Sequence, residues 1–517
     1  MSHPARGAWI EIAWTSVSTL PYGRTPRGVR GLKGAVTGYQ CNCAEGTGEG
    51  GRQNGIIIER GELMSELSEI VSKQKEFFNS NRTKSVGFRI RMLKRLEKAV
   101  RANEKQLLSA LHHDLGKSAA ESYMTELSIV YGEIHEAVRK VRYWSLPKPV
   151  LDSLGTFPSR SFVYPEPYGT ALIITPWNYP VNLSLAPLTA AIAAGNCAVV
   201  KCSRQSRRVS KLLRNILNHT FSDNYIYCTE MDIDYDELLE QNYDYMFFTG
   251  SPSVGKSVMR AASEHLTPVS LELGGKSPCI IDETADLKLA AKRVAWGKLL
   301  NAGQTCIAVD YVLVQNQVKA PFLKALQAEI EKRYPDPLQN DSYPCIINRK
   351  SYDRLVRLIE TEDRVIGGQA DLEKHKIAPA IFPEADFDHE IMKREIFGPL
   401  LPVIGYDDLD QAVREVKDRE KPLACYVFTR KKNHADKVIH ELSYGGGCVN
   451  DIIMHNANGH LPFGGVGNSG MGAYHGKYGF DTFTHKKAVL KSIILLDLPF
   501  RYPPFDDHKL KLLKKLL

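Results

Sequence analysis

The feature that most constrains this sequence is an alternation of two patterns that begins at about residue 164. Short apolar runs with the length of β-strands occupy residues 170–174, 198–200, 245–248, 277–281 and 311–314. Segments with the apolar spacing of helices lie between them, at 183–194, 205–218, 254–265 and 286–300. Strands that alternate with helices form parallel sheets covered by helices. The sequence therefore predicts an α/β fold.

Length and composition agree with a globular protein. The 517 residues suffice for two or three domains at roughly 100–200 residues each. Hydrophobic residues make up 43% and charged residues 24%, which excludes a wholly disordered or fibrous chain. The formal net charge of +8 is small for this length, so we expect no nucleic-acid partner. Apart from a Cys-x-Cys at 41/43, the ten cysteines are scattered without metal-ligand spacing, so we expect reduced thiols, a cytoplasmic protein and no metal site.

The first 63 residues differ in character from the rest of the chain. They hold twelve of the 39 glycines and no sustained apolar period, whereas helical spacing begins at Met64 and continues to about Leu111. We therefore expect residues 1–63 to be a disordered or non-native extension, with Met64 as the authentic start. An arginine-containing targeting peptide is the alternative, and the frequent glycines and glutamates disfavour it.

Residues 250–257 (GSPSVGKS) match the pattern of a phosphate-binding P-loop, after an apolar strand and before a helix. Asp282 follows a further strand and could bind the Mg²⁺ of a nucleoside triphosphatase. Against this interpretation, Pro252 removes one N–H from the loop, and a pattern with four free positions can arise by chance. A P-loop nucleotide-binding protein therefore stays open as an alternative.

A second group of residues has the chemistry needed for addition to a carbonyl group. Cys306 follows a small-residue turn, Glu272 lies where a strand-like run breaks at two glycines, and Asn178 comes directly after a strand. A cysteine nucleophile, a carboxylate base and an amide donor together meet the requirement. Taken singly, a buried cysteine is more often a small apolar residue, and a glutamate beside glycines is more often a cap or a solvated group.

Several motifs in one order favour the carbonyl chemistry. They are Pro176-Trp-Asn-Tyr-Pro, Val199-Val-Lys201, Phe248-Thr-Gly-Ser251, Leu271-Glu-Leu-Gly-Gly-Lys276, Gly303-Gln-Thr-Cys306, Glu395-Ile-Phe-Gly-Pro399 and Pro462-Phe-Gly-Gly465. Through these motifs the chain from about Met64 to Pro504 resembles the NAD(P)-dependent aldehyde dehydrogenases. Residues 114–117 (DLGK), 121–126 (ESYMTE) and 501–504 (RYPP) make it most similar to class 3, the short dimeric branch.

The resemblance implies a reaction and its residues. Cys306 would attack the aldehyde to give a thiohemiacetal, Asn178 and the Cys306 N–H would hold the oxyanion, and Glu272 would activate the water that hydrolyses the thioester. The implied substrate is a medium- or long-chain aliphatic or an aromatic aldehyde. A catalytically silent binding protein on the same scaffold is the alternative, and the intact catalytic residues argue against it.

The resemblance also implies NAD or NADP as cofactor, and it explains the P-loop string as a turn against the cofactor pyrophosphate. The implied cofactor residues are Lys201 and Glu395 at the two riboses, Gly250, Ser251 and Gly255 at the pyrophosphate, and Phe397 and Trp177 near the nicotinamide.

The sequence departs from the family pattern directly after Lys201. Where relatives usually continue Pro-Ser-Glu, this chain reads Cys202-Ser-Arg204. The usual glutamate pairs with ribose hydroxyls and repels a 2′-phosphate, so Arg204, with Arg207 and Arg208 nearby, predicts that NADP⁺ is accepted at least as well as NAD⁺. A solvated basic helix face is the alternative, and Cys202 is expected to be a packing residue.

The domain organisation follows from the same resemblance. It implies a Rossmann-like cofactor domain at 64–271, completed near 443–465, and an α/β catalytic domain at 272–442. A β-hairpin near 145–166 and strands within 466–500 would bridge the subunits of a homodimer.

The chain ends in a basic tail at 501–517, whose last nine residues have the pattern of a short amphipathic helix. We expect this helix to dock on its own protein. A weak contact with a membrane surface or a partner is the alternative.

Overall fold

The computed structural model describes residues 65–362, 364–497 and 499–516; the predicted extension at 1–63 lies outside them. A six-stranded sheet has the order β17-β7-β6-β3-β4-β5, and all its pairs are parallel except that of β17 with β7. Its central strands are buried along their whole length, as the apolar runs predict. The strands are β3 (Thr170–Ile174), β4 (Cys197–Lys201), β5 (Ile226–Cys228), β6 (Tyr245–Thr249), β7 (Val269–Glu272) and β17 (Gly470–Met471).

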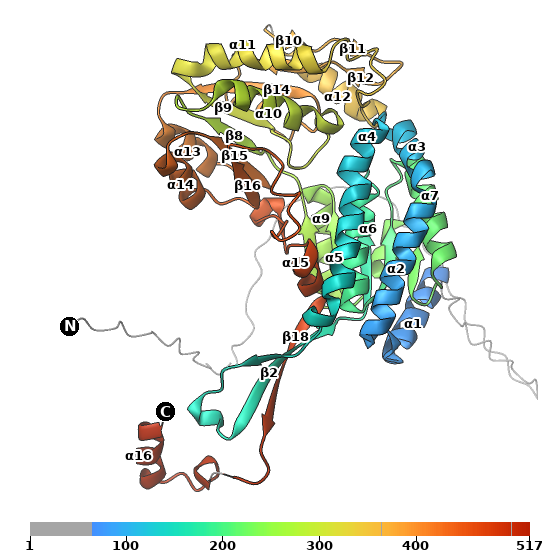
Figure 1. Cartoon of the computed structure of the whole chain (residues 1–517), viewed down its shortest axis with the longest axis vertical. Helices are drawn as coiled ribbons and strands as arrows, with labels where there is room; N and C mark the ends of the chain where they lie inside the picture. Colours follow the sequence, from blue (N-terminus) through green and yellow to red (C-terminus); the bar gives the residue numbers. More distant parts are fainter. Residues whose placement is uncertain (1–64, 363, 498, 517) are drawn as a thin grey trace, which may run out of the picture. The chain divides into compact units, whose positions relative to one another are not determined.

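Helix α6 (Asn182–Ala194) forms the centre of this half of the molecule. Every one of its residues is buried, because it packs on β3 and β4 and also contacts α2, α5 and α15 (Figure 1). The segment that joins β3 to α6 therefore lies between tightly packed elements. The other helices here are α1 (Glu66–Asn79), α2 (Val86–Ala102), α3 (Glu104–Leu115), α4 (Ala119–Ser122), α5 (Ser128–Trp144), α7 (Arg207–Thr220), α8 (Tyr235–Glu240), α9 (Pro252–Glu264) and α15 (Gly476–Thr482).

A second sheet has seven strands in the order β10-β13-β14-β9-β8-β15-β16. Helix α11 packs on β9 and β14, α13 on β14 and α14 on β15. The predicted α/β class is thereby confirmed. The strands are β8 (Pro278–Ile281), β9 (Tyr311–Gln315), β10 (Ile366–Gly367), β13 (Ala380–Phe382), β14 (Leu400–Tyr406), β15 (Ala424–Phe428) and β16 (Gly446–Val449). The helices are α10 (Leu287–Leu299), α11 (Asn316–Arg333), α12 (Arg349–Glu360), α13 (Leu409–Lys417) and α14 (Lys432–Glu441), and β11 (Ala370–Asp371) pairs with β12 (Lys376–Ile377).

The strand at 446–449 differs from expectation. We predicted that residues 443–465 return to the cofactor domain, but β16 pairs in parallel with β15 in the seven-stranded sheet. Consecutive strands joined through one helix, here α14, usually become neighbours in the same sheet. The strand that does return to the six-stranded sheet is β17, which pairs with β7 at Glu272.

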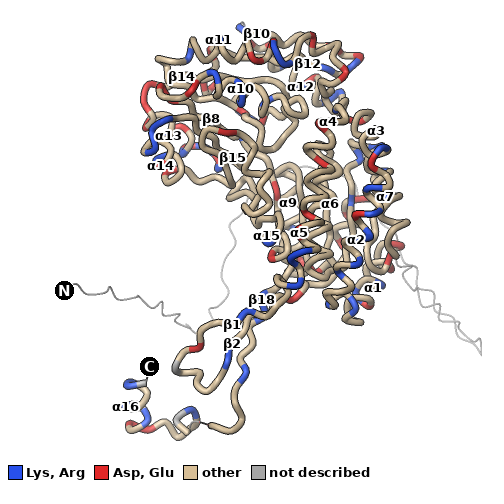
Figure 2. Tube along the Cα trace, viewed as in Figure 1, with Lys and Arg blue, Asp and Glu red and all other residues tan. Residues whose placement is uncertain are grey.

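Three further strands form an arm. β1 (Lys148–Val150) pairs with β2 (Ser159–Pro167), and β2 pairs over its whole length with β18 (Thr484–Ser492) (Figure 1). Helix α16 (Asp507–Leu516) follows β18 and carries Lys509, Lys511, Lys514 and Lys515 (Figure 2). None of the helices that the structure describes is long and apolar enough to cross a membrane.

Candidate active site

One channel of about 210 Å³ brings together eight of the ten residues that the sequence singles out. Glu272 is the last residue of β7, Asn178 follows β3 by four residues, and Cys306 follows the turn after α10. The remaining five on the channel wall are Trp177, Gly250, Ser251, Glu395 and Phe397. The two exceptions, Lys201 and Gly255, do not line it.

The turn before Cys306 has an unusual backbone. Asn301, Ala302 and Gly303 are all left-handed, with φ of 52°, 51° and 75°. Left-handed residues other than glycine are strained and persist only where surrounding contacts hold them. Here the side chain of Asn301 donates to the carbonyl of Gln304 at 3.1 Å, and a Cβ on Gly303 would collide with the carbonyl of Gly398. The turn therefore delivers Cys306 to a defined place.

The Cys306 thiol holds its proton strongly. Burial raises its pKa to about 12, and the carboxylates of Glu395 and Glu272 add to the effect. The backbone N–H groups of Cys306 and Ile307 oppose it. A cysteine is a nucleophile only as its thiolate, so a nucleophilic role for this thiol requires a base close by.

Two carboxyl groups face the channel with Cys306, that of the buried Glu272 and that of the half-buried Glu395. Glu272 is 2% exposed, neither of its oxygens has a hydrogen-bond partner among the described residues, and burial raises its pKa well above the usual range. Burial and then Asp310 raise the pKa of Glu395 to about 8. A buried carboxyl without partners is unfavourable for stability, which is typical of a group that meets a ligand or water instead.

Asn178 is buried, and its backbone and side chain are both held. Its carbonyl oxygen accepts from Asn301 Nδ2 at 2.9 Å and from Lys117 Nζ at 3.1 Å. Its Nδ2 donates to the carbonyl of Gln304 at 3.1 Å. Because an amide has two N–H groups, one remains to donate into the channel beside Cys306.

A second cavity, of about 190 Å³, reaches Cys306 from another direction. Its walls are mostly apolar, and only Leu183 and Cys306 belong to both cavities. The thiol thus lies between this apolar cavity and the channel that carries the carboxyl groups of Glu272 and Glu395. Apolar or aromatic residues of the cavity that sequence reasoning did not identify include Met124, Ile129, Trp296, Leu300, Ile453, Met454, Phe463 and Tyr474.

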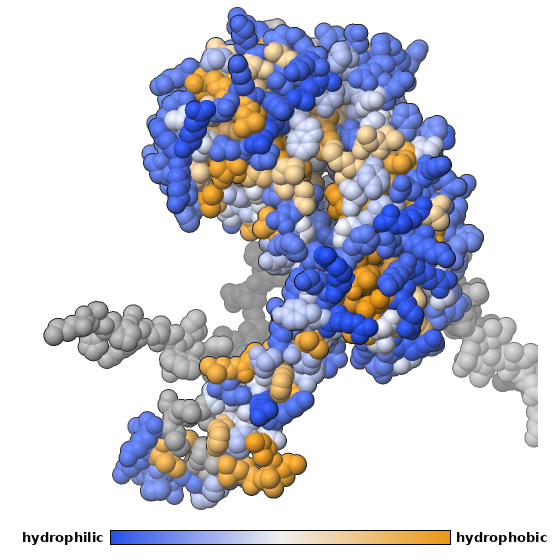
Figure 3. Space-filling view, in the orientation of Figure 1, coloured by the Kyte–Doolittle hydropathy of each residue, from blue (hydrophilic) through white to orange (hydrophobic). Residues whose placement is uncertain are grey.

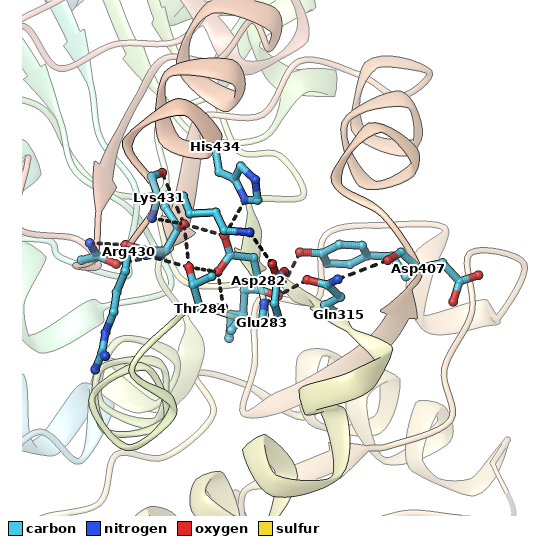
Figure 4. A network of polar contacts seen from close by, with 12 residues as sticks. Asp282, Glu283, Thr284, Gln315, Asp407, Arg430, Lys431 and His434 are labelled. Atoms are coloured by element: carbon cyan, nitrogen blue, oxygen red, sulfur yellow. Dashed lines mark hydrogen bonds and ion pairs between the residues drawn. The ribbon is translucent and has the colours of Figure 1, made fainter.

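The geometry also tests the P-loop alternative. Helix α9 begins at Pro252, so residues 252–257 form helical turns rather than an extended loop around a phosphate. Asp282 is buried, and Thr284, Thr429 and His434 all bond to its carboxylate (Figure 4). Burial by itself would raise the pKa of Asp282, but the hydrogen bonds from these partners outweigh it, so the pKa lies below its usual value. The carboxylate is fully engaged in joining β8 to β15, so it is not an open Mg²⁺ ligand.

The comparison with known families decides among the interpretations. Residues 62–489 match the sequence model of the "Aldehyde dehydrogenase family". The chain belongs to the aldehyde dehydrogenase family. It is an oxidoreductase that oxidises aldehydes to carboxylic acids with NAD⁺ or NADP⁺, as the sequence motifs predict.

Similar proteins match this chain over most of its length and over nearly all of their own. A 4,4'-diaponeurosporen-aldehyde dehydrogenase of Staphylococcus aureus is 45% identical over 444 residues, which are 85% of this chain and 96% of that protein. An "aldehyde dehydrogenase, dimeric NADP-preferring" of Rattus norvegicus is 39% identical over 85% of this chain and 98% of that protein. A solved structure of substrate-bound Staphylococcus aureus AldH has a TM-score of 0.85 and 43% identity, and the match covers 87% of this chain and 99% of that one.

The channel of this aldehyde dehydrogenase suits a dinucleotide. Ser251, at the start of α9, makes no side-chain cap bond, so the first N–H groups of the helix are free for an anion such as a pyrophosphate. The hydroxyl of Thr249 and the carboxyl of Glu272 line the channel and have no hydrogen-bond partner in the part of the chain that the structure describes. Lys201 is buried at the end of β4, with Nζ 4.8 Å from the centre of the Tyr235 ring.

Gly255 has a packing role in the same region. A Cβ there would lie 2.8 Å from Leu273 Cδ2, so the missing side chain lets α9 approach the residue after β7. The glycine thereby sets the position of the helix N-terminus without lining the channel.

Proposed function

We propose that Cys306 is the nucleophile, Asn178 the oxyanion donor and Glu272 the general base of this aldehyde dehydrogenase. The observation that carries the proposal is the buried Glu272 carboxyl, which lies on the channel wall with Cys306 and has no hydrogen-bond partner within the described ranges. A carboxylate with a raised pKa is a stronger base, and a thiol with a raised pKa needs one.

The chemistry proceeds in two stages on this chain. The Cys306 sulfur bonds to the aldehyde carbon while its proton passes to Glu272, and the carbonyl oxygen becomes an oxyanion. The Asn178 amide and the Cys306 N–H donate to that oxygen, and they oppose charge that exists only after attack. When bound, the nicotinamide ring supplies the hydride acceptor that converts the thiohemiacetal to a thioester.

Hydrolysis completes the reaction. Glu272 first passes the proton taken from Cys306 to bulk water. It then takes a proton from the attacking water, and the hydroxide adds to the thioester carbonyl. The C–S bond breaks to release the acid, and the Cys306 thiolate takes the proton from Glu272. Cys306→Ala should abolish NAD(P)H formation, whereas Cys448→Ala, a half-buried thiol outside both cavities, should retain it. Appreciable turnover by Cys306→Ala would remove the nucleophile from the proposal.

The apolar cavity supports a medium- or long-chain aliphatic or an aromatic aldehyde as substrate. The name of the Staphylococcus aureus relative, which refers to an apolar aldehyde, supports the same class. Each methylene buried in the cavity should raise kcat/KM by about fourfold, from about 0.8 kcal/mol per CH₂, until the cavity is filled. A panel of n-alkanals measures this, and a preference for short polar aldehydes would contradict it.

The surroundings of Lys201 support acceptance of NADP⁺ at least as well as NAD⁺. Arg204 is exposed and makes no ion pair with another described residue, while Arg207 pairs with Asp232 at 3.2 Å. Arg204 lies close enough to lower the pKa of Lys201, although burial is the larger cause. The rat relative is named NADP-preferring. A kcat/KM more than tenfold higher for NAD⁺ would contradict the proposal.

We further propose a cytoplasmic homodimer in which a second copy covers the arm. Leu151, Ile494 and Leu495 at its end are 97% exposed or more, and Figure 3 shows apolar surface there. The rat relative is named dimeric, which supports this occupant. Ile494→Asp/Leu495→Asp should shift the sedimentation coefficient from dimer to monomer. If the wild type is itself a monomer, the variant sediments unchanged and the protein binds anionic vesicles through α16, the result would favour a membrane surface rather than a second copy against the arm.

We also propose the division into a cofactor domain at 64–271 and a catalytic domain at 272–442. The six-stranded sheet lies mainly within 64–271 and the seven-stranded sheet mainly within 272–442, which supports cofactor and catalytic domains at those boundaries.

A further inference from the structure

A buried ion pair lies behind the catalytic residues, outside both cavities. Lys117 Nζ is 2.6 Å from Glu126 Oε1, and both side chains are 0% exposed. Lys117 follows α3, and Glu126 lies in a turn at residues 123–127 with π-helical hydrogen bonding. Removing two charges from water is unfavourable unless further hydrogen bonds satisfy them. The pair therefore needs an explanation in the groups that it contacts.

Those groups belong to one short segment, residues 178–182. The second Lys117 N–H donates to the Asn178 carbonyl at 3.1 Å, and the ammonium lies 4.0 Å from the centre of the Tyr179 ring. Glu126 Oε2 accepts from the backbone N–H of Val181 at 2.7 Å and of Asn182 at 3.3 Å. Helix α6 has no side-chain cap of its own, so the Glu126 carboxylate supplies one from another part of the chain.

The same segment is tied to the turn that carries the nucleophile. The Tyr179 hydroxyl and Thr305 Oγ1 are 2.6 Å apart, directly before Cys306. Asn301 Nδ2 and Lys117 Nζ both donate to the one carbonyl oxygen of Asn178. The position of the Asn178 amide relative to Cys306 therefore depends on an anchor on each side, the strained turn on one and the ion pair on the other.

We propose that Lys117 and Glu126 are positioning residues that fix the Asn178 amide for the oxyanion. The proposal rests on the oxyanion role proposed above for Asn178. Neither residue of the pair lines the substrate or the cofactor cavity, and the pair acts through the backbone of residues 178–182 and the Tyr179 ring. Its loss moves the Asn178 donor away from the place where negative charge develops.

The test variant removes both charges together, because a single substitution leaves an uncompensated buried charge. Lys117→Met/Glu126→Gln keeps the side-chain volumes and leaves one carbonyl oxygen facing the Val181 N–H. Glu126→Asp is the second variant: it keeps both charges and withdraws the carboxylate by one methylene. Thr189→Val is the matched control, because Thr189 is a buried residue of α6 whose hydroxyl bonds only within the helix.

The measurement is single-turnover NAD(P)H formation, with enzyme in excess over aldehyde, combined with cofactor binding by fluorescence. Asn178→Ala should slow formation by about 100-fold or more, as the loss of one oxyanion donor does. The double variant should slow it by about 10- to 100-fold, the effect of a donor displaced by about 1 Å. Glu126→Asp should show a smaller loss, of about 3- to 10-fold, and Thr189→Val about none. The KM for aldehyde and the affinity for cofactor should stay near the wild-type values.

The decisive result is the combined variant. If the pair acts through Asn178, adding Lys117→Met/Glu126→Gln to Asn178→Ala should slow NAD(P)H formation by less than about threefold relative to Asn178→Ala alone. Full additivity would show a merely structural effect and overturn the proposal. A wild-type rate of NAD(P)H formation in the folded double variant would also overturn the proposal. If the double variant does not fold, a wild-type rate in Glu126→Asp would overturn it. If Asn178→Ala alone is as fast as wild type, the oxyanion role fails first, and the positioning proposal fails with it.

Discussion

Glu272→Gln should separate the chemistry of the site from its stability. The pKa of the buried Glu272 carboxyl is raised well above 4.5, so the folded state binds this proton more tightly than the unfolded state. The unfolded chain therefore gains free energy by ionising this group as the pH rises above 4.5, while the folded chain does not. A glutamine, which does not ionise, removes that penalty.

The magnitude follows from the pH interval. At 1.36 kcal/mol per pH unit, the variant should be more stable than wild type by up to about 3 kcal/mol at pH 7 and by less than about 1 kcal/mol at pH 5. The gain can approach this limit because neither carboxyl oxygen loses a hydrogen bond in the exchange. At the same time, loss of the base should slow deacylation by about 10²- to 10⁴-fold.

Two assays check the two effects. Equilibrium unfolding in urea at pH 5 and pH 7 gives the free energy of unfolding of each protein. Stopped-flow NAD(P)H formation should show a burst of one equivalent per site followed by slow turnover. Glu166→Gln is the matched control: the hydrogen bond from Lys487 lowers the pKa of Glu166, so that variant should lose stability at neutral pH rather than gain it.

The reasoning would be refuted by a Glu272→Gln variant that is less stable than wild type at pH 7. That result would mean that the carboxylate is satisfied in solution by partners absent from the cavity walls. A gain of equal size at pH 5 and pH 7 would also contradict it, because the effect must grow with pH. Full steady-state turnover by the variant would remove Glu272 from the hydrolysis step.

Three further outcomes test the electrostatics and the cavities. Because the Cys306 pKa is about 12, its alkylation by iodoacetamide, followed by mass spectrometry, should rise about tenfold per pH unit from 7 to 10; a plateau near 9 would contradict the shift. Arg204→Glu should lower kcat/KM for NADP⁺ relative to NAD⁺ by about tenfold or more, because it restores repulsion of a 2′-phosphate, and equal ratios in variant and wild type would remove Arg204 from the site. Met124→Gln should lower kcat/KM for long alkanals by about tenfold and leave that for acetaldehyde unchanged; a uniform loss would argue against a cavity for the alkyl chain.

The fold was predictable where each segment is dominated by its own pattern. The run at 170–174 becomes β3 with the same bounds, because a strand buried on both faces reads as a continuous apolar stretch. The helical run from Met64 was not resolved into its parts. It forms α1, α2 and α3, separated by short turns at the Ser85 and Asn103 caps, and such caps are local signals that the period alone does not show.

The proposed catalytic residues and the cavity walls differ in how well the sequence predicts them. Cys306, Glu272 and Asn178 lie in motifs that keep their order along the chain, and the structure places all three on one channel. Met124 and Tyr474 lie some 350 positions apart and meet only after folding, so no local pattern could group them. The same holds for β16: its own sequence does not show which sheet it joins, because that depends on its pairing with β15 in the folded protein.

Hydrogen bonding divides the polar residues of this centre into two groups. Lys117, Glu126 and Gln304 are buried with their polar atoms bonded to backbone groups or, in the ion pair, to each other, so they determine where the chain lies. The carboxyl of Glu272 and the hydroxyl of Thr249 are buried without a hydrogen bond to any described residue, so they can meet water, substrate or cofactor. A buried polar group without partners lowers stability and persists where function needs it. By this criterion Asn178 belongs to both groups, because its carbonyl is anchored by the scaffold while one N–H of its amide remains for the reaction.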